Sequence, residues 1–149
     1  MYLQNLDEKY RLILKKGVTM KILVGYKGVN LGADLLKIAL EHARAFKGEV
    51  LIVTSMVGGG KDEQLNVQEA EENLEKVKVF FDEKEIPCKT HLLVRGLEAG
   101  EDIVSFAREK QVGEIIIGVK SRSKVGKLLF GSTAQAVILQ ADCPVLTVR

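Results

Sequence analysis

Small and basic residues near the carboxyl end of the chain have the types and spacing of a phosphate-binding loop. An apolar run at residues 115–118 ends in glycine, and a basic stretch with Arg122, Lys124 and Lys127 follows it. Residues 131–133 then precede a helix-like stretch. The first N–H groups of a helix lack partners within the helix, and the helix dipole attracts an anion there. The sequence therefore predicts a phosphate site formed by Gly118, Ser121, Arg122, Gly131, Ser132 and Thr133.

Other interpretations of the glycine-containing segments compete with this one. The loop of residues 118–133 could be an ordinary surface loop followed by a Ser/Thr helix cap. The segment Gly58–Lys61 reads GGGK, but Ser55 occupies the first glycine position of a P-loop and Asp62 follows the lysine. We therefore expect no P-loop, and a phosphate site and a simple cap both stay open for residues 118–133.

Residues that could act as acids, bases or metal ligands do not converge in the sequence. His42 and His91 fall within apolar patterns and are expected to be structural. Cys88 and Cys143 form no CxxC pair and have no neighbouring histidine, so we expect reduced, partly buried thiols. Acidic residues are scattered, without a pair placed for acid–base work. The sequence predicts no catalytic residue, no metal site and no enzyme activity beyond slow hydrolysis; a Mg²⁺ ion could accompany a triphosphate.

Apolar runs alternate with amphipathic segments from residue 20 onward. The runs predict strands at residues 20–26, 49–55, 88–95, 114–118 and 145–148, and the amphipathic segments predict helices at 33–46, 65–83, 100–110 and 132–140. Near-continuous apolar strands joined by helices are typical of a parallel sheet covered on both faces. Right-handed crossovers make such an α/β sheet doubly wound.

The expected sheet brings distant loops together. Ligands of open α/β sheets bind outside the carboxyl ends of the strands, where the winding direction reverses. The loops after residues 26, 55, 94 and 118 should therefore surround one crevice. The candidates to contact a nucleoside there include Val53, Ser55 and Gly96, the last because a turn glycine can adopt a positive φ.

Composition restricts the class of protein. The 149 residues are 46% hydrophobic and 28% charged, which suits one globular domain. A net charge of +2 is too small to indicate nucleic acid or an anionic membrane as a partner, and no apolar run reaches the roughly 20 residues of a membrane span. We expect a cytoplasmic protein, with residues 1–19 forming a peripheral helix that precedes a domain at 20–149.

The chain resembles the universal stress protein family from residue 20 to its end. The resemblance is carried by Gly118, Ser121, nine intervening residues and Gly131–Ser132, by MKILVGY at residues 20–26 and by CPVLTV at residues 143–148. It implies a five-stranded parallel sheet of order 3-2-1-4-5, similar to adenine nucleotide alpha hydrolases and other Rossmann-like folds. It also implies a homodimer that pairs the last strand, Val145–Val148, across a two-fold axis.

The glycine motif resembles the branch of the family that binds ATP or AMP. Two positions depart from that pattern: Ser121 replaces the second motif glycine, and Lys27 replaces the acidic residue that meets the nucleoside after the first strand. Lysine has no hydrogen-bond acceptor, although it could reach an anion. Tyr26 and Lys27 join the nucleoside candidates on this resemblance. Two functions stay open: a stress-response regulator that binds ATP or AMP with little or no hydrolysis and acts on an unknown protein partner, or a dimeric stress-response interaction module that does not bind ATP.

Overall fold

The computed structural model describes residues 17–119 and 130–149, so the predicted helix at residues 1–19 lies almost entirely outside them. Five parallel strands form one sheet in the order β3-β2-β1-β4-β5, which confirms the predicted fold and strand order. The strands are β1 (Lys21–Gly25), β2 (Glu49–Met56), β3 (Cys88–Val94), β4 (Glu114–Gly118) and β5 (Val145–Val148).

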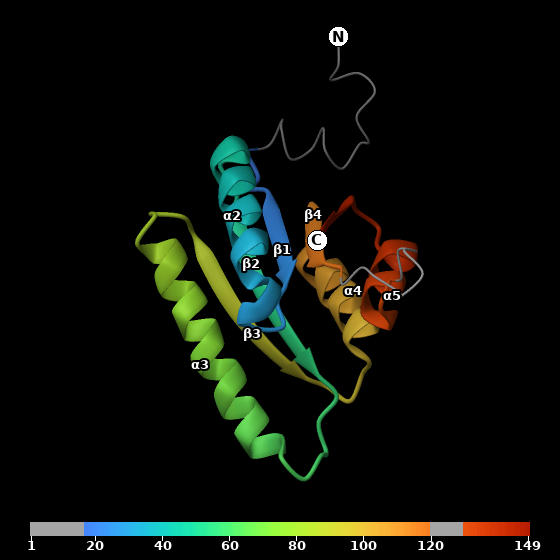
Figure 1. Ribbon diagram of the computed structural model, residues 1–149. Helices are drawn as coiled ribbons and strands as arrows, with labels where there is room; N and C mark the ends of the chain where they lie inside the picture. Colours follow the sequence, from blue (N-terminus) through green and yellow to red (C-terminus); the bar gives the residue numbers. More distant parts are fainter. Residues whose placement is uncertain (1–16, 120–129) are drawn as a thin grey trace.

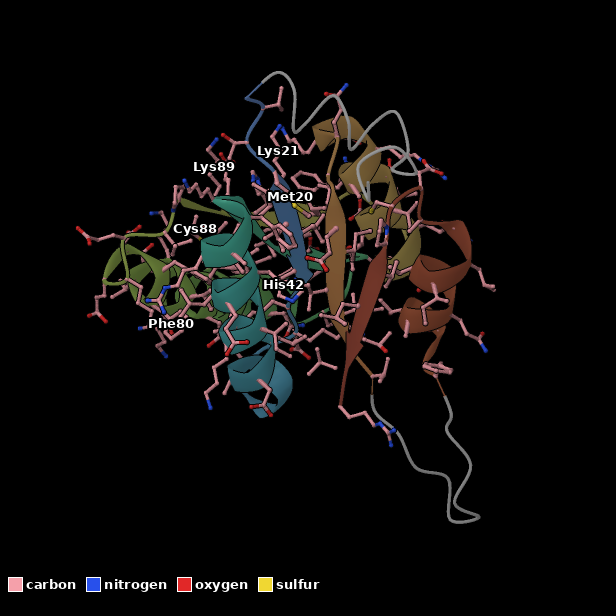
Figure 2. All side chains as sticks on the ribbon, turned by 90° about the horizontal axis from the view of Figure 1, so that it is seen from above. Met20, Lys21, His42, Phe80, Cys88 and Lys89 are labelled. Atoms are coloured by element: carbon pink, nitrogen blue, oxygen red, sulfur yellow. The ribbon has the colours of Figure 1, made fainter. Side chains whose placement is uncertain are left out.

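Helices cover both faces of the sheet, as the apolar strands require. Helices α2 (Val29–Phe46) and α3 (Glu63–Asp82) pack on one face, and α4 (Ala99–Lys110) and α5 (Ser132–Gln140) pack on the other (Figure 1). Figure 2 shows the sheet between these two helical layers, with Met20 and Lys21 entering β1 and Cys88 and Lys89 opening β3. None of the described helices combines the length and apolar character needed to cross a membrane.

The core follows the alternation of side chains along each strand. In β1, Ile22 and Val24 face α2 and α3, whereas Leu23 faces α4 and α5, and all three are fully buried. Among the described residues, Phe81 of α3 is the largest side chain that is buried completely. Two apolar clusters result, one on each face, because successive residues of a strand point to opposite sides of the sheet.

Two helices begin at least two residues earlier than the sequence pattern indicated. Helix α2 begins at Val29 rather than residue 33, and α3 begins at Glu63 rather than residue 65. Gly28 adopts φ 108°, which turns the chain directly from β1 into α2. Gly32 lies inside α2 because the ring of Tyr26 packs there: a Cβ on residue 32 would come within 2.5 Å of that ring. The sequence pattern placed this glycine outside the helix because glycine is a poor helix former.

Gly100 provides a stability test of the helical layer formed by α4 and α5. Where α4 crosses α5, a Cβ on residue 100 would lie 2.5 Å from the Ala136 Cβ and 3.0 Å from the Thr133 carbonyl oxygen. We expect Gly100→Ala to lower the free energy of unfolding by about 1–3 kcal/mol, the usual cost of overpacking, as measured by urea denaturation. In Gly60→Ala the new Cβ meets no atom within 4 Å, so this control should change stability by less than about 0.5 kcal/mol. Equal stability of the two variants would contradict the observed α4–α5 contact.

Candidate functional site

A cavity of about 410 Å³ opens at the carboxyl ends of β1, β2 and β4, between the helical layers. Two of the four loops expected to meet there, those after residues 26 and 118, contribute to its wall. The loops after β2 and β3 do not, although the end of β2 itself and the start of α4 do. The lining residues named below come from these two loops, from the ends of the strands, from α4, from the start of α5 and from α3. This volume falls within the range of sites for small molecules and cofactors.

Four of the six predicted phosphate residues line the cavity: Gly118, Gly131, Ser132 and Thr133. The other two, Ser121 and Arg122, lie outside the described residues. Helix α5 begins at Ser132, and its capping residue is Gly131, which has no side chain. The simple Ser/Thr-cap interpretation is therefore wrong for this helix. Ser132 and Thr133 are in its first turn, where the free N–H groups lie.

Lys27 reaches across the cavity mouth to the start of α5. Its Nζ donates a hydrogen bond to Thr133 Oγ1 at 3.3 Å, although the two residues are 106 positions apart. The helix N-terminus already carries a partial positive charge, so a neighbouring ammonium group is unfavourable unless an anion binds between them. Lys27 is predicted from the sequence to contact a nucleoside. In the structure it lies beside the residues predicted to hold a phosphate.

Three other predicted nucleoside residues also line the cavity: Tyr26, Val53 and Ser55. Tyr26 and Val53 are almost completely buried. The backbone of Tyr26 is fixed to β2, because its N–H donates to the Val53 carbonyl and its carbonyl accepts from the Thr54 hydroxyl, both at 2.8 Å. The positive φ expected of Gly96 is present, at 71°, but Gly96 is not among the described residues that line the cavity.

A buried carboxylate beneath Ser55 was not identified from the sequence. Asp102 of α4 is completely buried and accepts a hydrogen bond from Ser55 Oγ at 2.7 Å and another from Arg95 Nε at 2.6 Å. Arg95 also pairs with Glu109 at 2.9 Å. One signal was available: Asp102 sits beside Ile103 on the inward stripe of α4, where an acid must find a partner.

Two lining residues on α3, Glu69 and Asn73, also escaped sequence analysis. Asn73 approaches the turn at Gly28: its Nδ2 lies 3.9 Å from the position a Cβ would take there. Glu69 and Lys27 are the charged side chains among the described lining residues. In α3, Glu69 is exposed and Asn73 lies at the edge of the buried stripe of Leu74 and Val77, and the position of α3 beside the sheet directs both toward the cavity.

The histidines and cysteines have structural environments. His42 Nδ1 lies 2.8 Å from Glu114 Oε2, which joins α2 to β4. His91 packs against Phe106, with ring centroids 4.8 Å apart, and burial lowers the pKa of its imidazole. Burial raises the pKa of the Cys88 thiol to about 12, so this thiol is unreactive at neutral pH. Across residues 17–119 and 130–149, no group of three His, Cys, Asp or Glu side chains is placed to hold a metal ion.

Comparison with known proteins identifies a single family. The model of the Universal stress protein family matches residues 19–149. The universal stress protein MJ0531 of Methanocaldococcus jannaschii is 31% identical over 150 residues, which cover 92% of this chain and 87% of that protein.

Solved structures agree with this match. A universal stress protein from Archaeoglobus fulgidus is 36% identical, with a TM-score of 0.79 over 88% of this chain and 98% of that one. A universal stress protein from the same organism in complex with dAMP is 32% identical, with a TM-score of 0.74 over the same shares of the two chains. Because the family model spans most of the chain and the fold agrees with it, this chain belongs to the universal stress protein family.

Proposed function

We propose that this chain is a cytoplasmic stress-response regulator that binds an adenine nucleotide, ATP or AMP, with little or no hydrolysis. The observation that carries the proposal is the position of the Lys27 ammonium group at the N-terminus of α5, inside a cavity at the point where the sheet reverses its winding. In this arrangement a phosphate group would receive the free N–H groups of α5, the hydroxyls of Ser132 and Thr133, and one positive charge.

The rest of the cavity suits a nucleoside. Val53 and Ile103 provide apolar surface for a base, and Glu69 supplies an acceptor for a ribose hydroxyl from α3. Glu69 would thus supply the carboxylate that the family pattern places after β1, where this chain has Lys27. A relative at 32% identity was solved in complex with dAMP, an adenine nucleotide with a single phosphate, which supports the assignment of the ligand class.

A regulatory role fits the chemistry of the lining residues better than catalysis does. Among the described lining residues, the acidic group is Glu69, and no histidine accompanies it as a second acid or base. We expect any ATP turnover to stay well below about 1 s⁻¹, the lower end of typical enzymes. The regulatory signal is nucleotide occupancy, read by a protein partner that prefers the bound or the free state.

A second candidate function, a dimeric interaction module independent of ATP, is favoured by the exposed edge of the sheet. Strand β5 pairs with β4 on one side and ends the described sheet on the other. Its side chains Val145, Leu146 and Val148 are only half-buried, and Leu139 of the adjacent α5 is 81% exposed. This open edge would also allow two chains to pair through β5, whether or not the protein binds a nucleotide.

Thermal unfolding with millimolar AMP or ATP tests the nucleotide-binding function. A ligand at about 100 times its Kd adds roughly 2.7 kcal/mol to the free energy of unfolding, which raises Tm by several degrees. Gly131→Val should remove this shift while the variant still folds, because a Cβ there meets no atom within 4 Å among the described residues and φ is −65°. Valine is a poorer helix cap than glycine, so a small decrease in the Tm of the free protein is expected. If neither nucleotide raises the Tm of the unmodified protein, the interaction module becomes the better account.

Lys27→Met tests whether the ammonium group recognises phosphate. We expect calorimetric titration at low salt to show about tenfold weaker binding of AMP, since a charge-assisted hydrogen bond is lost, with adenosine binding unchanged. Raising the salt concentration should reduce the difference in AMP affinity between the unmodified protein and Lys27→Met, because Lys27 is exposed and salt screens its charge. Lys76→Met removes an equal charge from the exposed side of α3 and should leave AMP binding unaltered. Equal losses for AMP and adenosine would show that Lys27 acts on the nucleoside or on the fold instead.

Thr147→Pro tests the proposed dimer. Pro144 and Val148 direct their carbonyl oxygens to β4, so the backbone of Thr147 faces the open edge. Proline removes that outward N–H while leaving the β4 pairing intact. Light scattering should give twice the 16.4 kDa chain mass for the unmodified protein and for Thr147→Val, but a single chain mass for Thr147→Pro. A dimeric Thr147→Pro variant would place the interface elsewhere.

A further inference from the structure

Beneath the ligand cavity, the hydroxyl of Ser55 has a fixed hydrogen-bonding direction. Ser55 Oγ lies 2.7 Å from Oδ2 of Asp102, whose side chain has no exposure to solvent. The other oxygen, Oδ1, accepts a hydrogen bond from Arg95 Nε at 2.6 Å. Arg95 Nη2 also donates to the backbone carbonyl of Asp102 at 3.3 Å. Both carboxylate oxygens of Asp102 are therefore occupied by donors.

The charge on Arg95 determines which partner gives the proton. A guanidinium group has no acceptor and keeps its proton, so the carboxylate that it pairs with is ionised and can only accept. Ser55 must therefore donate its single hydroxyl proton to Asp102. A hydroxyl has one proton and two lone pairs, so toward the cavity, which Ser55 lines, only acceptor capacity remains.

The order of the strands places Ser55 at the end of the cavity opposite the phosphate residues. Ser55 lies on β2, whereas Gly118 ends β4 and α5 follows it, and β1 runs between the two strands. Two inter-strand spacings separate β2 from β4 by roughly 10 Å. A phosphate held at α5 would therefore direct the base of a nucleotide toward Ser55, beside the apolar side chains of Val53 and Ile103.

We propose that Ser55 selects 6-aminopurine over 6-oxopurine nucleotides, with Asp102 and Arg95 as positioning residues that keep its hydroxyl an acceptor. Adenine presents an amino donor at position 6, whereas guanine and hypoxanthine present a carbonyl acceptor there. An oxo group opposite the Ser55 lone pairs would bring two acceptors together without a proton. This inference rests on the proposed nucleotide-binding function and adds the origin of its base preference.

The test compares the affinities of AMP and IMP, which share the sugar and phosphate. We expect the unmodified protein to bind AMP about tenfold more tightly than IMP, since an unpaired acceptor costs about as much as a lost hydrogen bond. In Ser55→Ala this ratio should fall to near one. The matched control is Ser105→Ala, which removes a hydroxyl bonded to Glu109 in the same network but away from the cavity, and it should keep the tenfold ratio.

Asp102→Asn provides the sharper readout, because a merely structural role would not reverse a preference. The Asn amide can donate to Ser55, which frees the Ser55 proton to point into the cavity. The variant should then bind IMP as well as AMP or better. Because Asp102→Asn can impair folding at this buried site, Ser55→Ala is the decisive variant if Asp102→Asn is unfolded. Ser55→Ala leaves Oδ2 of Asp102 without its donor, which lowers stability, but keeps the pair between Asp102 and Arg95.

The outcomes separate this inference from the function on which it rests. A tenfold preference for AMP that disappears in Ser55→Ala supports the role of Ser55. Equal binding of AMP and IMP by the unmodified protein, or a preference that persists in Ser55→Ala, overturns it while leaving nucleotide binding intact. If the unmodified protein binds neither nucleotide, both the inference and the proposed function fail.

Discussion

The reversal of winding between β1 and β4 is the constraint on which the site depends. The chain adds β2 and β3 on one side of β1 and then returns to add β4 and β5 on the other. Every strand is nonetheless parallel, so the connecting helices must leave the sheet on opposite faces. The loops after β1 and β4 consequently diverge at the carboxyl edge, and the space between them becomes the cavity lined by Lys27 and Gly118. Burial of apolar strands on both faces fixes this geometry before any ligand contact forms.

Two electrostatic arrangements at the cavity explain how one nucleotide could be recognised at both ends. At one end, Lys27 and the N-terminus of α5 concentrate positive potential where a phosphate would lie. At the other end, the Arg95–Asp102 pair orients the Ser55 hydroxyl so that its proton points to Asp102 and its lone pairs face the cavity. A buried ion pair adds little net stability because desolvation offsets its Coulomb attraction. The role proposed for this pair is therefore to orient the Ser55 hydroxyl beside the cavity.

Much of the fold could be predicted from the sequence, whereas several contacts of the site could not. Apolar runs and amphipathic spacing identified the five strands and the helices between them, because burial on one or two faces leaves a periodic pattern. The early start of α2 escaped prediction because Gly32 is required by the Tyr26 ring, a tertiary contact. The bond from Lys27 to Thr133 and the burial of Asp102 likewise depend on elements far apart in the sequence.

The most direct test of the account is an NMR titration of the isotopically labelled protein with AMP, followed through backbone amide shifts. If AMP binds in the cavity, the largest changes are expected at the carboxyl edge of the sheet, at Lys27, Ser55, Ser132 and Thr133, with little change at Cys88, which opens β3 at the opposite edge. Saturable shifts confined to that cavity would establish the nucleotide site. Absence of shifts at millimolar AMP, or shifts centred on the β5 edge, would contradict the account.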